Sequence, residues 1–262
     1  MKNEVDNGKG GIALEAGVVL KMQGICMTFP GVKALEGVDL TLKKGEIRAL
    51  MGENGAGKST LIKCLTGVNK FEAGEIYLEG FDHPIVNKDT MDAQKKGIST
   101  VYQEVNLCPN LSVAENLYIG REPLTKLGTV NRKAMNRQAA ALMKQLELDV
   151  DVTRNLEEYS LALQQMIAIA RAVDMSAKVL ILDEPTSQLD PEGSDEVFRA
   201  VETLTGSGIT ILMIEQKIEK LAAMDPGKID GSCAAERIFF IRCKKQFQLW
   251  MGSRRIFHDR KS

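Results

Sequence analysis

Residues 52–60 read GENGAGKST and place three glycines next to a lysine and two hydroxyl side chains. Closely spaced glycines let the backbone curl so that successive N–H groups point at phosphate oxygens, and a following helix directs its positive end at the same group. In the pattern G-x-x-x-x-G-K-[ST], Lys58 would reach the β- and γ-phosphates and the hydroxyl of Ser59 would ligate Mg²⁺. The alternative is a glycine-rich turn that only caps a helix. The predicted phosphate site comprises Gly52, Glu53, Asn54, Gly55, Ala56, Gly57, Lys58, Ser59 and Thr60.

A second candidate site follows the apolar run 179–182, which ends on Asp183 and Glu184. If this run is a strand beside the phosphate loop, Asp183 would lie near Mg²⁺ and bind it, usually through water. Glu184, one residue further, could accept a hydrogen bond from an attacking water and polarise it. The alternative is a solvated acidic strand end, but the phosphate loop favours a shared site.

The strands and helices that must position these residues can be predicted from the periodicity of the hydrophobic residues. Alternating or apolar runs predict strands at 18–22, 38–42, 47–51, 75–78, 98–102, 179–182 and 210–214. Three- and four-residue spacing predicts helices at 59–65, 112–118, 132–146, 160–173 and 194–204. This order predicts an α/β fold whose parallel-sheet core carries an antiparallel β lobe and a helical insertion.

The composition of the 262 residues is that of a globular protein, with 44% hydrophobic and 26% charged residues. It excludes a disordered chain, a collagen-like chain and a disulfide-stapled miniprotein. The 34 basic and 35 acidic residues give no support for nucleic-acid binding by bulk charge. Five cysteines without a C-x-x-C pair predict reduced thiols, and no apolar run approaches the ~18 residues of a membrane span.

The charge is unevenly distributed along the chain. Residues 229–262 hold eight basic and three acidic residues, together with the one tryptophan and four of the eight phenylalanines. The preceding residues hold 26 basic and 32 acidic residues. We therefore expect a flexible leader at 1–17, a main domain at 18–228 and a basic, aromatic tail at 229–262.

Four stretches resemble ATP-binding cassette (ABC) ATPases, specifically the subunits of bacterial sugar importers. They are FPGVKALEGVDL, GENGAGKSTLIKCLTGV, ISTVYQEVNLCPNLSVAENLYIGREP and SAKVLILDEPTSQLD. A fifth, YSLALQQMIAIARA, looks most like the galactofuranose type, with the ribose and galactose types close behind. The resemblance covers residues from about 19 to 222. It implies a P-loop NTPase with a RecA-like parallel sheet, a helical subdomain at about 104–173, and ATP and Mg²⁺ as ligands.

The resemblance also implies roles for residues outside the two predicted sites. Phe29 matches an aromatic residue that stacks on adenine, although a core position is the simpler interpretation of this residue alone. Gln103 matches the residue that joins the Mg²⁺ and water site to the transmembrane partner. Ser160 and Ala162 match a signature that caps the γ-phosphate held by a second cassette, and Ser160 is also a good helix N-cap. Asp190 matches a loop through which paired cassettes meet.

The sequence departs from the family pattern in three places. Leu163 stands where the signature commonly has glutamine, which weakens the match. After the strand at 210–214 the family usually has a histidine that contacts the γ-phosphate, whereas this chain has Glu215 and Gln216. Gln216 can donate an N–H but cannot titrate, so we expect slower or differently regulated hydrolysis. The family also commonly carries two cassettes in one chain, and only the first is present here.

The sequence therefore predicts the ATP-hydrolysing subunit of a sugar importer, with Glu184, Gln216 and Gln103 in catalysis and with Ser59, Gln103 and Asp183 at the metal. Expected partners are transmembrane permease subunits, a periplasmic or extracellular sugar-binding protein and a second cassette, with no nucleic acid. The expected location is the cytoplasm, peripheral on the inner face of the cell membrane. Two alternatives remain open, which are a truncated cassette that binds ATP without productive hydrolysis or transport and a soluble ABC protein without a membrane partner.

Overall fold

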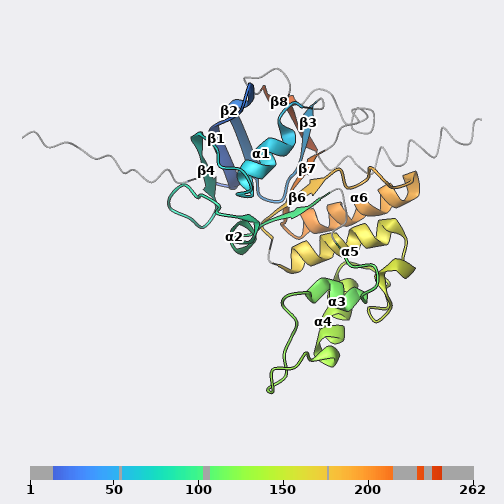
Figure 1. Ribbon diagram of the computed structural model, residues 1–262. Helices are drawn as coiled ribbons and strands as arrows, with labels where there is room; N and C mark the ends of the chain where they lie inside the picture. The colour runs from blue at the N-terminus through green and yellow to red at the C-terminus, as the bar shows by residue number, and fades with distance from the viewer. Residues whose placement is uncertain are drawn as a thin grey trace, which may run out of the picture.

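The computed structural model describes residues 14–52, 55–102, 107–175, 177–214, 229–232 and 238–243, the last two ranges by their backbone alone. Two sheets organise these residues (Figure 1). The first is antiparallel, with the order β2-β1-β4, and comprises β1 Val18–Phe29, β2 Val32–Lys43 and β4 Ala73–Leu78.

The second sheet has the order β5-β6-β7-β3-β9-β8. Its parallel strands are β3 Ile47–Gly52, β5 Ile98–Val101, β6 Val179–Asp183 and β7 Thr210–Ile214. The antiparallel strands β8 Ile229–Ser232 and β9 Ile238–Cys243 continue it beside β3. Residues 179–182 are fully buried, as expected for a parallel strand covered on both faces.

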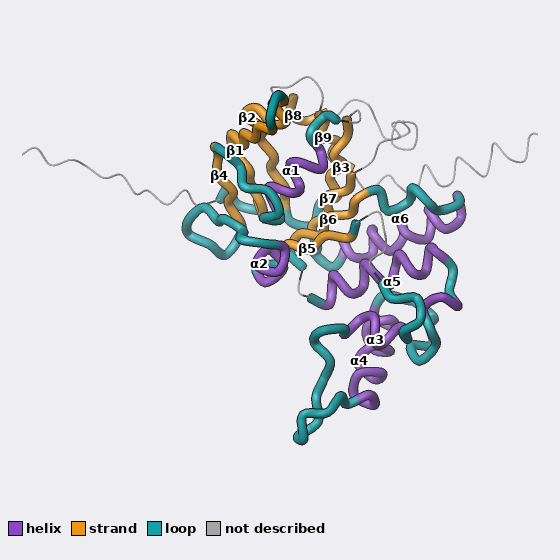
Figure 2. Tube along the Cα trace, in the orientation of Figure 1, coloured by secondary structure: helices purple, strands orange, loops and turns teal. Residues whose placement is uncertain are grey.

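The helices form two groups, which Figure 2 separates clearly. The helix α1 lies against both sheets, and the short α2 packs against β5. The helices α5 and α6 cover the other face of the parallel sheet, and α3 and α4 pack on α5 at the far end of the molecule. Their bounds are α1 Lys58–Leu65, α2 Thr90–Lys95, α3 Val113–Tyr118, α4 Arg132–Gln145, α5 Leu161–Asp174 and α6 Pro191–Gly206, with a 3₁₀ turn at Leu156–Glu158.

The predicted fold class is confirmed, because a parallel sheet, an antiparallel lobe and a helical insertion are all present. The structure adds three elements that periodicity did not predict, namely α2, β8 and β9. The division of the chain at residue 228 stays a prediction, but β8 and β9 both belong to the second sheet. In the part of the chain that the structure describes, no helix is long and apolar enough to cross a membrane.

The entrance to the helical insertion is organised by the buried amide of Asn116. Its Oδ1 accepts from the backbone N–H of Cys108 at 2.7 Å. Its Nδ2 lies 2.9 to 3.2 Å from the carbonyl oxygens of Cys108, Leu111 and Ser112. One side chain that is 1% exposed thus satisfies the backbone of the turn that leads into α3.

We expect Asn116→Ala to lower the free energy of unfolding by about 2 to 4 kcal/mol, because several partly buried backbone groups lose their partner together. Denaturant unfolding of the purified chain measures this. The matched control is Gln138→Ala, which removes an exposed amide from α4 and should stay within about 0.5 kcal/mol of the parent. Equal unfolding midpoints for the two variants would contradict the assigned role of Asn116.

Candidate functional site

The predicted phosphate loop joins β3 to α1, and its backbone has the conformation that its glycines permit. Gly55 and Gly57 have φ angles of 81° and 98°, in the left-handed region that other residues rarely adopt. A Cβ atom at Gly57 would lie 2.6 Å from the carbonyl oxygen of Ala34 on β2. Gly57 is therefore required twice, for its backbone angle and for the close approach of the loop to the antiparallel sheet. Glu53 and Asn54 lie outside the described residues.

Lys58 is the first residue of α1, and its side chain turns back across the loop. Its Nζ donates a hydrogen bond of 2.6 Å to the carbonyl oxygen of Gly52, and the residue is 6% exposed. Burial lowers the pKa of the Lys58 ammonium, whereas the negative charges of Glu184 and Asp183 raise it. The chain thus holds a buried cation at the phosphate loop, where an anionic ligand would compensate it.

Asp183 and Glu184 lie at the carboxyl end of β6, as the sequence predicts. The pKa of Asp183 is raised by burial and then by the charge of Glu184, while Lys58 and Lys63 act in the opposite direction. Glu184 has a φ angle of 48°, and its N–H donates to the carbonyl of Ile214 on β7 at 3.0 Å. A glutamate in this conformation costs about 1–2 kcal/mol. Such strain is found where a side chain must be directed for function.

One cavity brings the separate predicted residues together. It has a volume of about 280 Å³ and joins the adenine candidate Phe29 to the phosphate loop and to Glu184. Its lining residues are Phe29, Val32, Ala34, Gly55, Ala56, Gly57, Lys58, Ser59, Thr60, Glu184 and Ile214. The lining thus combines an aromatic ring, a phosphate loop and a carboxylate, which are the parts that a nucleoside triphosphate and its attacking water require.

Sequence reasoning missed the cavity residues that come from β2 and β7. Val32 follows Phe29 after a two-residue turn, and its exposure of 61% is high for a strand valine. The Pro-Gly pair at 30–31 was the available signal, because a tight turn returns the chain to the same site. Nothing in the local sequence predicts that Ala34 or Ile214 lines this cavity.

The donors near the phosphate loop fit a magnesium ion. Ser59 is exposed and lines the cavity, and Asp183 is a carboxylate whose ionised form is disfavoured by burial and by Glu184. Mg²⁺ prefers oxygen donors, and a divalent cation here would relieve the repulsion between the two carboxylates. The third predicted ligand, Gln103, lies outside the described residues, and so does Gln216.

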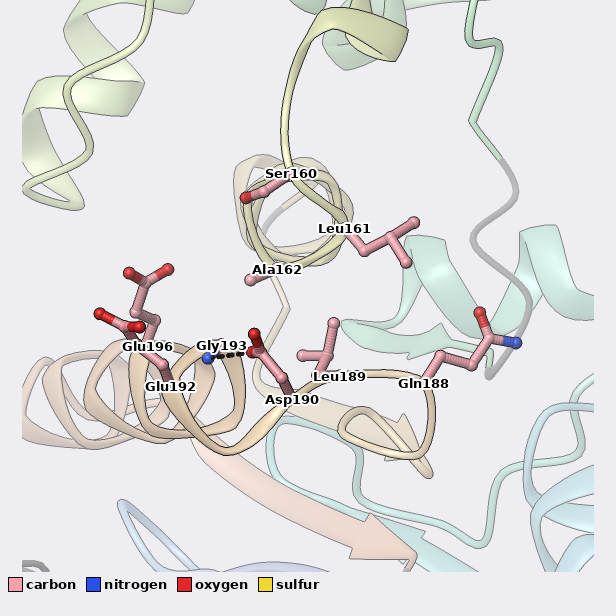
Figure 3. Close-up of a pocket in the computed structure, with 9 residues that line it drawn as sticks. All are labelled: Ser160, Leu161, Ala162, Gln188, Leu189, Asp190, Glu192, Gly193 and Glu196. Atoms are coloured by element: carbon pink, nitrogen blue, oxygen red, sulfur yellow. Dashed lines mark hydrogen bonds between the residues drawn. The ribbon is translucent and has the colours of Figure 1, made fainter.

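The signature residues lie together at a second cavity, of about 420 Å³ (Figure 3). Ser160 caps α5 by accepting from the N–H of Leu163 at 3.3 Å, so its interpretation as an N-cap is confirmed. Asp190 caps α6 by accepting from the N–H of Gly193 at 2.8 Å. A Cβ atom at Gly193 would lie 2.9 Å from that of Ala162, so the starts of the two helices pack closely.

The two cavities share no lining residue. The phosphate loop and the residues of the signature therefore lie in different places on one chain.

A third cavity, of about 200 Å³, lies between β5 and α5 and is lined by Gln94, Thr100, Val101, Tyr102, Leu107, Ala168, Arg171, Ala172 and Met175. Two of its residues, Tyr102 and Leu107, flank the segment that contains Gln103.

Residues 35–187 match the family model of the ABC transporter, and the chain belongs to this family. It is 49% identical over 203 residues to the galactofuranose transporter ATP-binding protein YtfR of Escherichia coli, a match that covers 78% of this chain and 40% of YtfR. The fructose import ATP-binding protein FruK of Bifidobacterium longum is 48% identical, with 78% and 39% covered. The ribose import ATP-binding protein RbsA 1 of Rubrobacter xylanophilus is 44% identical, with 78% and 40% covered.

The chain therefore spans about 40% of the length of these curated relatives. Among solved structures, a nucleotide-free ATP-binding cassette from an ABC transporter is similar with a TM-score of 0.66 and 27% identity, over 79% of this chain and 84% of that one. A dimeric ATP-binding cassette in a post-hydrolysis state, bound to ADP and Pi, has a TM-score of 0.61 and 25% identity, with 76% and 89% covered.

The raised pKa of Asp183 predicts a pH-dependent stability. A carboxylate whose pKa is higher in the folded than in the unfolded chain destabilises the fold progressively as the pH rises above the unfolded pKa, and the effect is complete above the folded pKa. In the absence of nucleotide and Mg²⁺, Asp183→Asn should therefore be more stable than the parent at pH 7. This advantage should shrink as the pH falls toward 3.8, the ordinary value for aspartate.

Thermal and denaturant unfolding between pH 4 and pH 8 checks this expectation. The control is Asp82→Asn, which removes an exposed carboxylate from a loop and should follow the parent over the same range. A variant Asp183→Asn that is less stable than the parent at pH 7 would show that the neighbouring lysines, and not burial, decide the charge at this position.

Proposed function

We propose that this chain is an ATP-binding and ATP-hydrolysing cassette that drives a carbohydrate importer, most like the galactofuranose type. The observation that carries this proposal is the cavity in which Phe29, the phosphate loop and Glu184 meet. The sugar-import names of the relatives support the transport role. The similarity to a dimeric ATP-binding cassette supports a second cassette as a partner.

Binding of ATP uses the two ends of this cavity. The ring of Phe29 stacks on the adenine, which is worth about 1–3 kcal/mol in comparable complexes. Lys58 and the N–H groups at the start of α1 hold the β- and γ-phosphates. Ser59, Asp183 and Gln103 would hold Mg²⁺, which would supply positive charge to offset that of the phosphates.

Hydrolysis uses the carboxylate at the end of β6. Glu184 accepts a hydrogen bond from a water, orients it for in-line attack and takes its proton. The water oxygen bonds to the γ-phosphorus, the bond to the β–γ bridging oxygen breaks, and ADP and phosphate are formed. Lys58 balances the charge that moves onto the leaving oxygen. Gln216 donates an N–H to the γ-phosphate where the family usually has histidine.

The separation of the first two cavities supports a head-to-tail pair of cassettes. In such a pair, Ser160 and Ala162 of one cassette present the start of α5 to the γ-phosphate held by the other. Asp190, on the same face, contacts the second cassette. Each cassette thus supplies half of each composite site.

Partners and location follow from the same proposal. The cavity between β5 and α5, next to the segment that contains Gln103, is the place where a cytoplasmic part of the permease docks. The chain would then be peripheral on the inner face of the membrane, and a periplasmic or extracellular protein would deliver the sugar. No nucleic acid takes part.

We expect Glu184→Gln to bind ATP with unchanged affinity but to hydrolyse it about 10²- to 10⁴-fold more slowly, because only the base is lost. Lys58→Ala should lose both binding and hydrolysis. Phosphate release with and without permease subunits measures the rates, and Lys95→Ala, on the exposed face of α2, is the matched lysine control. The same background rate in the parent, Glu184→Gln and Lys58→Ala would support a truncated cassette that binds without turnover.

Substitution of Gln216 tests the departure from the family pattern. Gln216→His introduces a group that can become cationic next to the γ-phosphate, so hydrolysis should accelerate about tenfold or more below pH 7. Gln138→His, which places a histidine on the exposed face of α4, should leave the rate unchanged. If Gln216→His does not raise the rate of ATP hydrolysis, Gln216 is not the cause of slower hydrolysis.

A further inference from the structure

Phe29 is the last residue of β1, and this strand extends beyond the end of its pairing with β4. In the antiparallel sheet β1 is the middle strand, but its pairing with β4 ends where Cys26 meets Ala73. The last three residues of β1 pair only with β2, where the register is irregular around Thr28. The part of β1 that carries Phe29 is therefore a two-stranded ribbon, which is marginally stable by itself.

Glu72, the residue before β4, takes the place of the missing strand partner. Its own N–H donates to the carbonyl of Cys26 at 2.8 Å, which fixes its backbone beside β1. Its Oε1 then accepts from the N–H of Thr28 at 3.2 Å, and its Oε2 accepts from the hydroxyl of Thr28 at 3.1 Å. A single carboxylate thus accepts from both hydrogen-bond donors of the residue that precedes Phe29.

This contact matters because the ring of Phe29 is only partly packed against the protein. Phe29 is 38% exposed and lines the cavity, and the turn that follows it uses Gly31 with a φ angle of 82°. A ring that must accept a flat base cannot be buried in the core, so its direction depends on the backbone that carries it. A fixed backbone lowers the entropy that is lost when the base binds.

We propose that Glu72 is a positioning residue for recognition of the nucleotide base, acting through Thr28 on the ring of Phe29. This inference rests on the proposed function, since it requires that Phe29 stacks on adenine. Glu72 is neither part of the phosphate loop nor one of the residues that line the cavity. Its effect is therefore confined to the base half of the ligand.

The test is a double-mutant cycle on the full chain with two probes, ATP and inorganic tripolyphosphate, which has no base. Calorimetry gives the dissociation constants for the parent, Glu72→Ala, Phe29→Ala and the double variant. Glu72→Ala should weaken ATP binding about threefold to tenfold and leave tripolyphosphate binding unchanged. In the Phe29→Ala background the same substitution should have no further effect on ATP, because the residue through which it acts is gone.

Two further variants serve as a conservative substitution and as a control for the double-mutant cycle. Glu72→Gln retains one acceptor oxygen for Thr28, so its loss of ATP affinity should lie between the parent and Glu72→Ala. Glu36→Ala removes another exposed carboxylate, which pairs with Lys33 at 3.1 Å on β2, and should not change ATP binding. If Phe29→Ala does not fold, Phe29→Leu replaces it, since leucine keeps the apolar volume without a flat ring.

Each contrary result identifies what has failed. Equal weakening of ATP and tripolyphosphate by Glu72→Ala, or additive losses in the double variant, would overturn the positioning role. Unchanged ATP binding in Glu72→Ala would overturn it as well. If Phe29→Ala binds ATP normally while Lys58→Ala does not, the base contact is wrong but the phosphate site stands. If the parent binds neither probe, the proposed function itself fails.

Discussion

The burial of α1 between the two sheets is the constraint on which the nucleotide site depends. Leu61 and Leu65 of this helix are fully buried in a core shared with strands of both sheets. The phosphate loop leads directly into the same helix, so its place is set by hydrophobic packing on both sides. The close approach of Gly57 to Ala34 then joins the loop to the strand that follows the Pro-Gly turn. Phosphate and base are thereby held at a fixed separation.

The charged residues of the site are buried at a cost in free energy. Lys58 and Asp183 are both held where burial disfavours their ionised forms, and Glu184 adopts a left-handed backbone. None of these features stabilises the fold. The three residues lie close together, because the charges of Asp183 and Glu184 act on Lys58. The site thus combines buried charge with backbone strain, whereas the buried side chain of Asn116 satisfies backbone groups and serves the stability of the fold.

Much of this site could be predicted from the sequence because its parts are local. The loop at 52–60 and the strand that ends on Asp183 each need only a few consecutive residues, and the cap at Ser160 acts within one helical turn. The extent of β1 could not be predicted, since its bulges at 22–27 interrupt the alternation that marks a strand. The short α2 was not predicted because its apolar residues, Met91 and Ala93, show no three- or four-residue spacing.

The remaining features depend on contacts between residues that are distant in the chain. Glu72 and Thr28 are 44 residues apart, and each is an ordinary surface residue until the sheet forms. The lining of the cavity by Ile214 depends likewise on its pairing with Leu50 of β3, which is 164 residues earlier in the chain. Short sequence motifs were sufficient to predict the reacting groups. The contacts that orient these groups form only when the sheets assemble, so they could not be predicted.

The pairing of β9 with β3 has a consequence for the whole molecule. The register runs without a break from Ile47 opposite Cys243 to Gly52 opposite Ile238, so the strand that leads into the phosphate loop is hydrogen-bonded on both sides. Without that distant segment, β3 would become the open edge of the parallel sheet, with a row of unpaired N–H and C=O groups beside the nucleotide. Such edges recruit other chains. The last described strand therefore covers the edge of β3 beside the phosphate loop.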